Sequence, residues 1–239
     1  MGGHNRVTNN QPICIIPARG GSKRLPRKNI AEVGGKPIIC WTIEQAMESN
    51  LFDRIIVSTD DEEIADIAGK YSDVEVWGRS SELSSDISTV DQVCLDIFKR
   101  FLVRNIKLPT NFCCLYATAI LRTAEDIKKG YQEILSENVD LVLSVTDYEQ
   151  YPHQALRLEN DGKVTIQWPD LLHMSRQERP HLVVDAGSIY WLNTESFIKN
   201  KNFYGKSIRG YTLPRERAID VDTKNDLDIL QFYWNKKGK

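Results

Sequence analysis

The chain has 239 residues, 41% of them hydrophobic, which is enough for one sizeable α/β core with a small inserted unit. Basic and acidic residues nearly balance, at 31 and 33, so no overall field draws the protein to nucleic acid or to a membrane surface. Recognition of an anion must therefore be local. Apolar runs all fall short of the ~20 residues that span a bilayer, and we expect no membrane association.

Cysteine usage and the start of the chain predict the compartment and the domain limits. The cysteines form no C-x-x-C pair of the kind that binds zinc or cycles in redox chemistry, and four of the five lie in apolar runs. They are Cys14, Cys40, Cys94, Cys113 and Cys114. We expect reduced, buried thiols in a cytoplasmic protein. Residues 1–11 are polar and contain glycine, so we expect a disordered tail before a single domain over 12–239.

Short β-branched apolar runs alternate with helical patterns from residue 12 to residue 145. The predicted strands are 12–17, 54–58, 74–77, 111–118 and 141–145. The predicted helices between them are 37–49, 61–71, 89–102 and 123–136. This β-α repeat predicts an α/β, Rossmann-like fold with a mostly parallel sheet and helices on both faces.

The pattern changes after the fifth predicted strand. Apolar segments at 155–158 and 163–167 flank Asn160-Asp161-Gly162, which is a strong hairpin signal. A buried-strand composition returns at 187–192 and is followed by a short edge strand at 210–213 and a closing helix at 224–234. The hairpin therefore belongs to a small antiparallel insertion, placed at 147–183, that interrupts the repeat.

The loop 18–29 follows the first predicted strand, at the edge where open parallel sheets bind ligands. It carries two adjacent glycines, Gly20 and Gly21, and five cations within ten residues. The cations are Arg19, Lys23, Arg24, Arg27 and Lys28. Mobile positive charge beside approachable backbone amides is what a triphosphate requires, whereas a solvated basic turn is the alternative. The spacing matches neither a P-loop nor G-x-G-x-x-G, which disfavours P-loop hydrolases and dinucleotide oxidoreductases.

Several stretches of the sequence carry a family resemblance. The first is Pro17-Ala-Arg-Gly-Gly-Ser-Lys-Arg-Leu-Pro-Arg-Lys-Asn29, and the others are 52–60, Arg79 with 82–83 and 85–86, 121–123 and 219–223. Together they resemble the acylneuraminate cytidylyltransferase, or CMP-sialic acid synthetase, family, whose fold is of the nucleotide-diphospho-sugar transferase type. The resemblance implies Mg²⁺-assisted transfer of CMP from CTP to the anomeric hydroxyl of a nine-carbon 2-keto sugar acid, with release of pyrophosphate.

The same resemblance assigns residues to the nucleotide. It places CTP against Arg19, Gly20, Gly21, Ser22, Lys23, Lys28, Asn29, Arg79 and Ser88. Lys23 is expected nearest the reacting phosphate. It would act with Arg19 through electrostatic stabilisation and positioning, which makes both residues catalytic candidates.

Asp220 and Asp222 are two residues apart, so in an extended segment both carboxylates face one way and can share a hard cation. From the residues alone, a capping cluster before the helix 224–234 is the alternative. The resemblance favours Mg²⁺, bridged by these carboxylates and the triphosphate. It also places a metal-held water or hydroxide near Asp222 as the base, so Asp222 is the third catalytic candidate.

The sugar acid is indicated by two departures from family members that use N-acetylneuraminic acid. Tyr116-Ala-Thr-Ala-Ile-Leu-Arg122 replaces their Gln-Pro-Thr-Ser-Pro-Leu-Arg, and Val184-Asp-Ala-Gly-Ser188 replaces their Arg-Pro-Asn-Gly-Ala. Both stretches look more like the pseudaminic acid cytidylyltransferase branch. The residues expected to contact the sugar are Tyr116, Thr118, Arg122, Arg176, Gln177 and Asp185.

Several alternatives stay open at this point. N-acetylneuraminic acid, legionaminic acid and the eight-carbon Kdo are other acceptors, while a sugar-1-phosphate nucleotidyltransferase and a non-catalytic nucleotide-binding protein are other functions. For Asp185, a simple turn before a strand is an equal alternative. His153, His173 and His181 match no metal spacing and are expected to be packed or exposed. The resemblance also implies a homodimer in which the 147–183 arm reaches the partner's active site.

Overall fold

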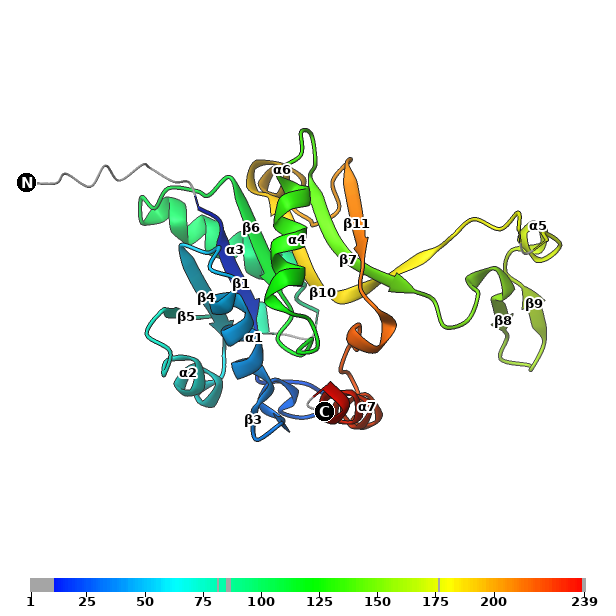
Figure 1. Cartoon of the computed structure of the whole chain (residues 1–239), viewed down its shortest axis with the longest axis horizontal. Helices are drawn as coiled ribbons and strands as arrows, with labels where there is room; N and C mark the ends of the chain where they lie inside the picture. The colour runs from blue at the N-terminus through cyan, green and yellow to red at the C-terminus, as the bar shows by residue number, and fades with distance from the viewer. Residues whose placement is uncertain (1–10, 81, 85–86, 176, 238–239) are drawn as a thin grey trace, which may run out of the picture.

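The computed structural model describes residues 11–80, 82–84, 87–175 and 177–237. The tail expected at 1–11 lies, apart from Gln11, outside the described residues. The centre of the protein is a seven-stranded sheet in the order β11-β7-β10-β6-β1-β4-β5 (Figure 1). Its strands are β1 (Ile13–Pro17), β4 (Arg54–Thr59), β5 (Val74–Gly78), β6 (Asn111–Leu115), β7 (Leu141–Asp147), β10 (Val183–Asn193) and β11 (Ile208–Thr212).

All strands of this sheet except β10 run in one direction. β1 pairs in parallel with β4 and β6, β4 with β5, and β7 with β11. β10 is antiparallel to both of its neighbours, β6 and β7. The mostly parallel sheet predicted from the sequence is therefore confirmed.

Helices cover both faces of the sheet, as the sequence predicts. α1 (Ile38–Glu48), α2 (Glu62–Ala68) and α4 (Ala124–Ile134) pack on one face, and α3 (Val90–Val103) and α6 (Thr194–Asn200) pack on the other. Along β1 the side chains alternate, so that Cys14 and Ile16 enter the first core and Ile13 and Ile15 enter the second. The five cysteines are free and buried, as expected.

Local signals explain where several helices begin. Thr89 and Thr123 each close a capping box, and α3 and α4 start directly after them. α7 (Lys224–Lys237) packs through Leu227 and Leu230 on a third core. The shorter elements are β2 (Glu32–Val33), β3 (Lys36–Pro37), η1 (Lys28–Ile30), η2 (Glu82–Ser84) and η4 (Arg215–Arg217). Among the described residues, helices that are long and apolar enough to cross a membrane are absent.

Between β7 and β10 the chain leaves the body of the protein as a projecting arm (Figure 1). The arm contains η3 (Pro152–Gln154), β8 (Leu156–Leu158), β9 (Val164–Ile166) and α5 (Pro169–Leu172). β8 and β9 form the predicted hairpin, with Leu156 opposite Ile166 and Leu158 opposite Val164. The helices α5 and α6 were not expected from the sequence; the 4 residues of α5 are too few to show a helical period.

The strand order creates a switch point between β1 and β6. From β1 the chain passes through α1 to β4 and β5 on one side of the sheet, and from β5 it returns through α3 to β6 on the other side. The loops that follow β1 and β6 therefore diverge at the carboxyl edge. In open α/β sheets this is the crevice where ligands bind.

Candidate active site

A cavity of ≈ 260 Å³ lies at the switch point. Its walls come from the ends of β1 and β6, from η1, from the segments that follow β5 and open α3, and from the segment before α7. The predicted site residues that line it are Arg19, Lys28, Asn29, Arg79, Ser88, Tyr116, Thr118, Asp220 and Asp222. Positions as far apart as 19 and 222 therefore meet in one site.

The first glycine of the loop is used for packing against the end of β4. The Gly20 amide donates to Asp60 Oδ1 at 3.0 Å, and a Cβ at this position would overlap the Asp61 carboxylate. The expectation that the Gly20 amide is turned toward a ligand is therefore wrong for this conformation. Gly21 faces open space, and Ser22 is half-buried beside it.

Arg27 is directed away from the cavity. Its backbone is left-handed, with φ 60°, which is uncommon outside glycine. Its guanidinium pairs with Asp61, the N-cap of α2, and with Glu63 in the first turn of that helix. Arg27 thus anchors the loop to α2, and its charge is not added to the cavity.

Asp222 joins the loop to the segment before α7. It accepts from Arg24 Nη2 at 2.7 Å and from Lys28 Nζ at 3.1 Å, and Lys28 also donates to a backbone carbonyl of that segment at 3.0 Å. Asn29 is buried and donates to the Arg19 carbonyl at 2.9 Å, which ties η1 to the end of β1. Protein groups therefore hold these loop residues in place before any ligand binds.

Asp220 and Asp222 line the same cavity, as their spacing predicts. Loss of hydration, together with the nearby charge of Asp222, raises the pKa of Asp220. A divalent cation would relieve this repulsion, and one or two carboxylates with substrate phosphates are a common Mg²⁺ ligand set. Within the described residues, no group of three His, Cys, Asp or Glu side chains is placed to hold a metal alone. The pair therefore fits a cation that phosphate oxygens help to bind.

Thr223, and not the acidic pair, takes the capping role that was the alternative for this segment. Thr223 Oγ1 accepts from the Asp226 amide at 3.3 Å, and Asp226 Oδ2 accepts from the Thr223 amide at 2.7 Å. This reciprocal pair caps α7. The carboxylates of Asp220 and Asp222 are thereby left to face the cavity.

Arg79 brings a further fixed cation to the cavity. Its Nε and Nη2 donate to the Ser58 carbonyl at 3.1 Å and 2.6 Å. Burial lowers the pKa of Arg79, but a guanidinium still carries its charge near neutral pH. Thr89 and Val90 also line the cavity at the amino end of α3, where the helix dipole favours an anion. Thr89 and Val90 were not predicted to line the site, although the capping signal at Thr89 predicts that the helix begins there.

Several predicted residues lie outside the cavity lining. Lys23 is exposed on the loop, and Gln177 is exposed in the arm, away from the sheet. Arg176, another residue expected to contact the sugar, lies outside the described residues. Two of the three histidines are packed or paired within the protein. His153 is buried within the arm, and His181 contacts Asp147 at 2.8 Å.

Arg122 lies beneath the site and is fully buried. Its Nη1 donates to the Tyr116 carbonyl at 2.8 Å and to the Ser188 carbonyl at 3.4 Å. The prediction that Arg122 contacts the sugar is wrong, because no part of its side chain reaches the surface. The residue instead joins the loop after β6 to β10.

Asp185 also lies outside the cavity lining, on an irregular part of β10. Its Oδ1 accepts from the Gly187 amide at 2.9 Å, which is the local turn that was one of its two alternatives. Tyr190 is buried, as expected for a core residue, but its hydroxyl donates to the Asp185 carboxylate. The sequence held no signal for this contact, because it depends on the irregularity of the strand.

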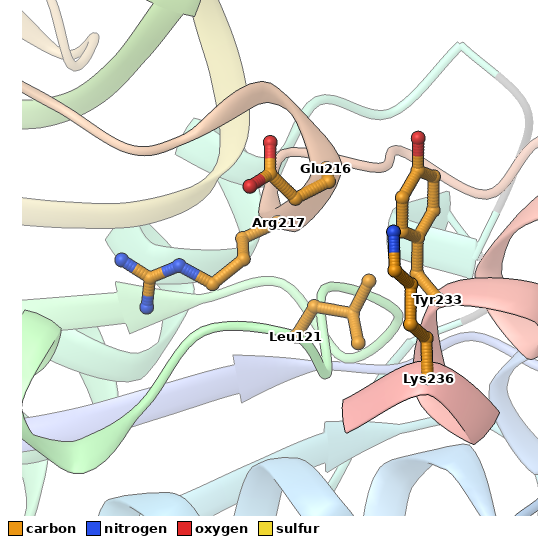
Figure 2. Close-up of a pocket in the computed structure, with 5 residues that line it drawn as sticks. All are labelled: Leu121, Glu216, Arg217, Tyr233 and Lys236. Atoms are coloured by element: carbon orange, nitrogen blue, oxygen red, sulfur yellow. The ribbon is translucent and has the colours of Figure 1, made fainter. Parts of the chain in front are cut away.

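A second hollow, of ≈ 470 Å³, lies between η4, α7 and the loop after β6 (Figure 2). Leu121 and Tyr233 form apolar walls in it. Arg217 is turned away from Tyr233 and pairs with Asp126 at 2.6 Å. The hollow therefore combines apolar walls with Glu216 and Lys236, whereas the switch-point cavity gathers several cations beside an acidic pair and is the candidate active site.

A family model described as cytidylyltransferase matches residues 13–227. The chain belongs to this family. A pseudaminic acid cytidylyltransferase of Campylobacter jejuni is 32% identical over 223 residues, which cover 93% of this chain and 95% of that protein. A CMP-N,N'-diacetyllegionaminic acid synthase of Legionella pneumophila is 33% identical and covers 92% of this chain and 94% of its own length.

The fold of this cytidylyltransferase is also that of a solved structure, a CMP:2-keto-3-deoxy-manno-octonic acid synthetase complexed with CTP. The two superpose with a TM-score of 0.69 at 15% identity, covering 95% of this chain and 99% of the other. The Rossmann-like fold predicted from the β-α repeat is therefore confirmed.

We expect Arg122→Ala to lower the free energy of unfolding by about 2–4 kcal/mol, because it empties a buried site and removes the hydrogen bonds that join the Tyr116 and Ser188 carbonyls through one side chain. Arg24→Ala is the control, since the Arg24 side chain is 67% exposed, and it should cost less than about 1 kcal/mol. Chemical denaturation followed by circular dichroism measures both. Equal costs would contradict the structural role of Arg122.

Proposed function

We propose that this protein transfers CMP from CTP to the anomeric hydroxyl of a nine-carbon 2-keto sugar acid, with release of pyrophosphate, and that pseudaminic acid is its preferred acceptor. The observation that carries the proposal is the meeting of Arg19, Lys28 and Arg79 with the carboxylates of Asp220 and Asp222 in one cavity. The names of the Campylobacter and Legionella relatives, which specify such acids, support the acceptor class.

The triphosphate is proposed to lie between the loop 18–29 and the amino end of α3. Arg19, Lys28 and Arg79 line this part of the cavity and supply positive charge around the phosphates. Lys23 lies on the exposed arc of the loop with Gly21 and Ser22, and its long, flexible stem suits it to close over the reacting phosphate. The Ser88 hydroxyl donates to the Glu82 carbonyl at 2.6 Å and lines the same cavity, where its oxygen is proposed to contact the base or the ribose.

In the reaction, the anomeric hydroxyl gives its proton to a base beside Asp222, a bond forms between its oxygen and the α-phosphorus, and the bond from that phosphorus to pyrophosphate breaks. Negative charge shifts to the leaving group, so cations already fixed around it stabilise the transition state more than the ground state. Arg24 and Lys28 hold Asp222 at the cavity, where with Asp220 it would bind Mg²⁺. When bound, the metal would neutralise phosphate charge and orient the triphosphate.

The acceptor is proposed to occupy the part of the cavity lined by Tyr116 and Thr118, on the β6 side of the switch point. From there its anomeric oxygen would approach the α-phosphorus held from the β1 side. We place the reaction in the cytoplasm, which supplies CTP and keeps thiols such as the free cysteines of this chain reduced.

We further propose that the protein works as a homodimer through its arm. Leu156, Leu158, Val164 and Ile166 lie on one face of the β8–β9 ribbon and are each at least 42% exposed. A two-stranded ribbon is marginally stable by itself, and apolar side chains exposed on one face of it favour a covering partner. A second copy of the chain is the occupant that fits, since the arm that carries this face projects away from its own body (Figure 1).

The proposed activity is tested by incubating the protein with CTP, Mg²⁺ and a panel of sugar acids. The panel contains pseudaminic, N,N'-diacetyllegionaminic and N-acetylneuraminic acids and the eight-carbon Kdo. We expect pyrophosphate release with pseudaminic acid to be the fastest. Turnover of a sugar 1-phosphate alone, or CTP binding without any turnover, would contradict the proposal.

The same assay tests Lys23. Lys23→Ala should lower kcat by about 10²-fold, because a cation near the reacting phosphate acts mainly in the transition state, and should leave the melting temperature unchanged. Lys70→Ala, at another exposed position, is the control and should keep the wild-type rate. A Lys23→Ala variant as fast as this control would remove the catalytic role of Lys23.

The metal site is tested by titrating Mg²⁺ in the assay. Asp220→Asn and Asp222→Asn should each raise the half-saturating Mg²⁺ concentration by about tenfold, because each removes one charged ligand. Asp228→Asn is the control, since Asp228 is an exposed residue of α7 paired with Lys224. A wild-type metal response in both site variants would show that the pair does not bind the cation.

The dimer is tested by light scattering coupled to gel filtration. Val164→Asp should raise the dimer dissociation constant by about 10²-fold, because it places a charge on the apolar face of the ribbon. Thr165→Asp adds the same charge to the opposite face, beside Arg157, and should leave the dimer intact. A monomeric wild-type protein, or equal effects of the two changes, would refute the arm interface.

A further inference from the structure

The loop 18–29 carries Lys23 on an exposed arc whose two ends lie against one carboxylate. That carboxylate belongs to Asp61, which lies two residues beyond β4 and is the N-cap of α2. At the first end of the arc, a Cβ on Gly20 would overlap Asp61 Oδ2. At the other end, Arg27 Nη1 pairs with the same oxygen. The arc from residue 20 to residue 27 is therefore closed at its base by a single side chain.

The two oxygens of the Asp61 carboxylate have different partners. Oδ1 accepts from the Ile64 amide at 3.0 Å and caps α2, whereas Oδ2 pairs with the Arg27 guanidinium. Loss of hydration raises the pKa of Asp61, but the hydrogen bonds from the Ile64 amide and from Arg27 outweigh it and hold the pKa below its usual value. The carboxylate is thus ionised near neutral pH, and its hydrogen bond with Arg27 is of the stronger, charge-assisted kind.

The backbone at Arg27 does not require an arginine. Its φ of 60° is a conformation that glycine and asparagine adopt more readily than a long side chain does. The other described non-glycine residues with positive φ are Asn50, Asn105, Asn138 and Lys201. The contribution of Arg27 therefore lies in its guanidinium, which reaches Asp61 and also Glu63 in the first turn of α2.

The other cations around the proposed triphosphate are held independently of this pair. Arg79 donates to a carbonyl of β4, and Lys28 pairs with Asp222. The backbone carbonyl of Arg19 accepts from a buried side chain of η1. Lys23 differs from these three because it lies within the arc, between the two ends that meet at its base. Its position therefore depends on how firmly the arc is closed.

We infer that Arg27 and Asp61 are positioning residues for the reaction, which close the base of the arc and thereby hold Lys23 where it reaches the reacting phosphate. The inference rests on the proposed function, because the role of Lys23 belongs to that proposal. Neither member of the pair lines the switch-point cavity, so neither is placed to touch the nucleotide. Both act through Lys23.

A closed arc favours the transition state because its order is established before the substrate binds. An arc that is open at its base samples more conformations, and bringing Lys23 to the phosphate then costs conformational entropy in every turnover. Lys23 is expected to act mainly in the transition state, whereas the separately held cations bind the triphosphate in the ground state as well. Loss of the pair should therefore lower kcat more than it weakens the binding of CTP.

Asp61→Asn tests the pair without altering the sequence of the loop. Asparagine caps a helix as well as aspartate does, so the contact with the Ile64 amide is kept and only the charge facing Arg27 is lost. We expect kcat to fall by about tenfold and the KM for CTP to change by less than about twofold. Asp66→Asn, at an exposed position of α2, is the control and should keep the wild-type kcat. A raised KM for CTP with an unchanged kcat would overturn the inference.

Arg27→Asn and Lys201→Asn form a matched pair, since each replaces a cation at a left-handed position, with φ 60° and 58°, by a residue that adopts this conformation readily. Lys201 is exposed at the C-cap of α6, on another part of the protein. Arg27→Asn should lower kcat by about tenfold, and Lys201→Asn should leave it unchanged. If only the turn mattered, both variants would be as fast as wild type, and the inference would be overturned. Melting temperatures establish that each variant is folded.

A double-mutant cycle tests whether the pair acts through Lys23. In a Lys23→Ala background the arc no longer carries the cation, so adding Arg27→Asn should lower kcat by less than a further factor of about two. A full further tenfold loss would show that Arg27 acts by another route and would overturn the inference.

NMR relaxation of backbone amides in the full chain, without substrate, decides the order of the arc independently of activity. We expect the order parameters of residues 21–25 to fall in Asp61→Asn from about 0.85, the value of a rigid backbone, to about 0.6 or less, and to stay high in Asp66→Asn. Equal order parameters in the two variants would overturn the inference. A wild-type protein that turns over no acid of the panel would contradict the proposed function, while the relaxation data would still decide whether the pair orders the arc.

Discussion

The pairing of Arg24 and Lys28 with Asp222 is the interaction on which the candidate site depends. Cations crowded into one short loop repel each other by up to a few kcal/mol per close pair near a protein surface, and would otherwise move apart into solvent. Asp222 offsets this repulsion and also closes the cavity between segments almost two hundred residues apart. In the proposed reaction, a bound triphosphate would draw these cations to its phosphates and make the Asp222 carboxylate available to a metal ion.

The antiparallel strand β10 links the two halves of the site. Its pairing with β7 shifts register between Asp185 and Tyr190, and Gly187 in this irregular part lies against Asp220, because a Cβ at this glycine would stand 3.4 Å from the Asp220 carboxyl carbon. The Tyr190 hydroxyl donates to Asp185 across the same irregularity, and the Tyr190 ring packs against Tyr116. One irregularity in a strand therefore lies beside both the acidic pair proposed to bind the metal and the wall proposed to hold the sugar.

Much of the fold was predictable, because its signals are local. Strand and helix alternation, the caps at Thr89 and Thr123, and the Asn160-Asp161-Gly162 turn each depend on neighbours in the chain, and the structure has the corresponding elements. The errors at Gly20 and Arg122 have another origin. The residues were noted, but Gly20 bonds to Asp60 beyond β4 and Arg122 bonds to the Ser188 carbonyl of β10, and both contacts depend on segments far away in the sequence. Whether a glycine serves a ligand or a packing contact is decided by those partners.

The nucleotide half and the sugar half of the site differ in how they use polar groups. This difference explains why the first could be predicted from the sequence and the second could not. Charge acts over several ångströms and tolerates displacement, so a basic loop after a strand already indicates an anion site. Hydrogen-bond direction is different, since a tyrosine hydroxyl both donates and accepts, and its role is set by the next group along a chain. On the β6 side, the Tyr116 ring packs against Tyr190, whose hydroxyl donates to Asp185 on an irregular part of β10, and no local pattern in the sequence brings these three residues together. The residue type gives Tyr116 the capacity to bind a sugar, but the groups around its hydroxyl are set by tertiary packing between the loop after β6 and β10.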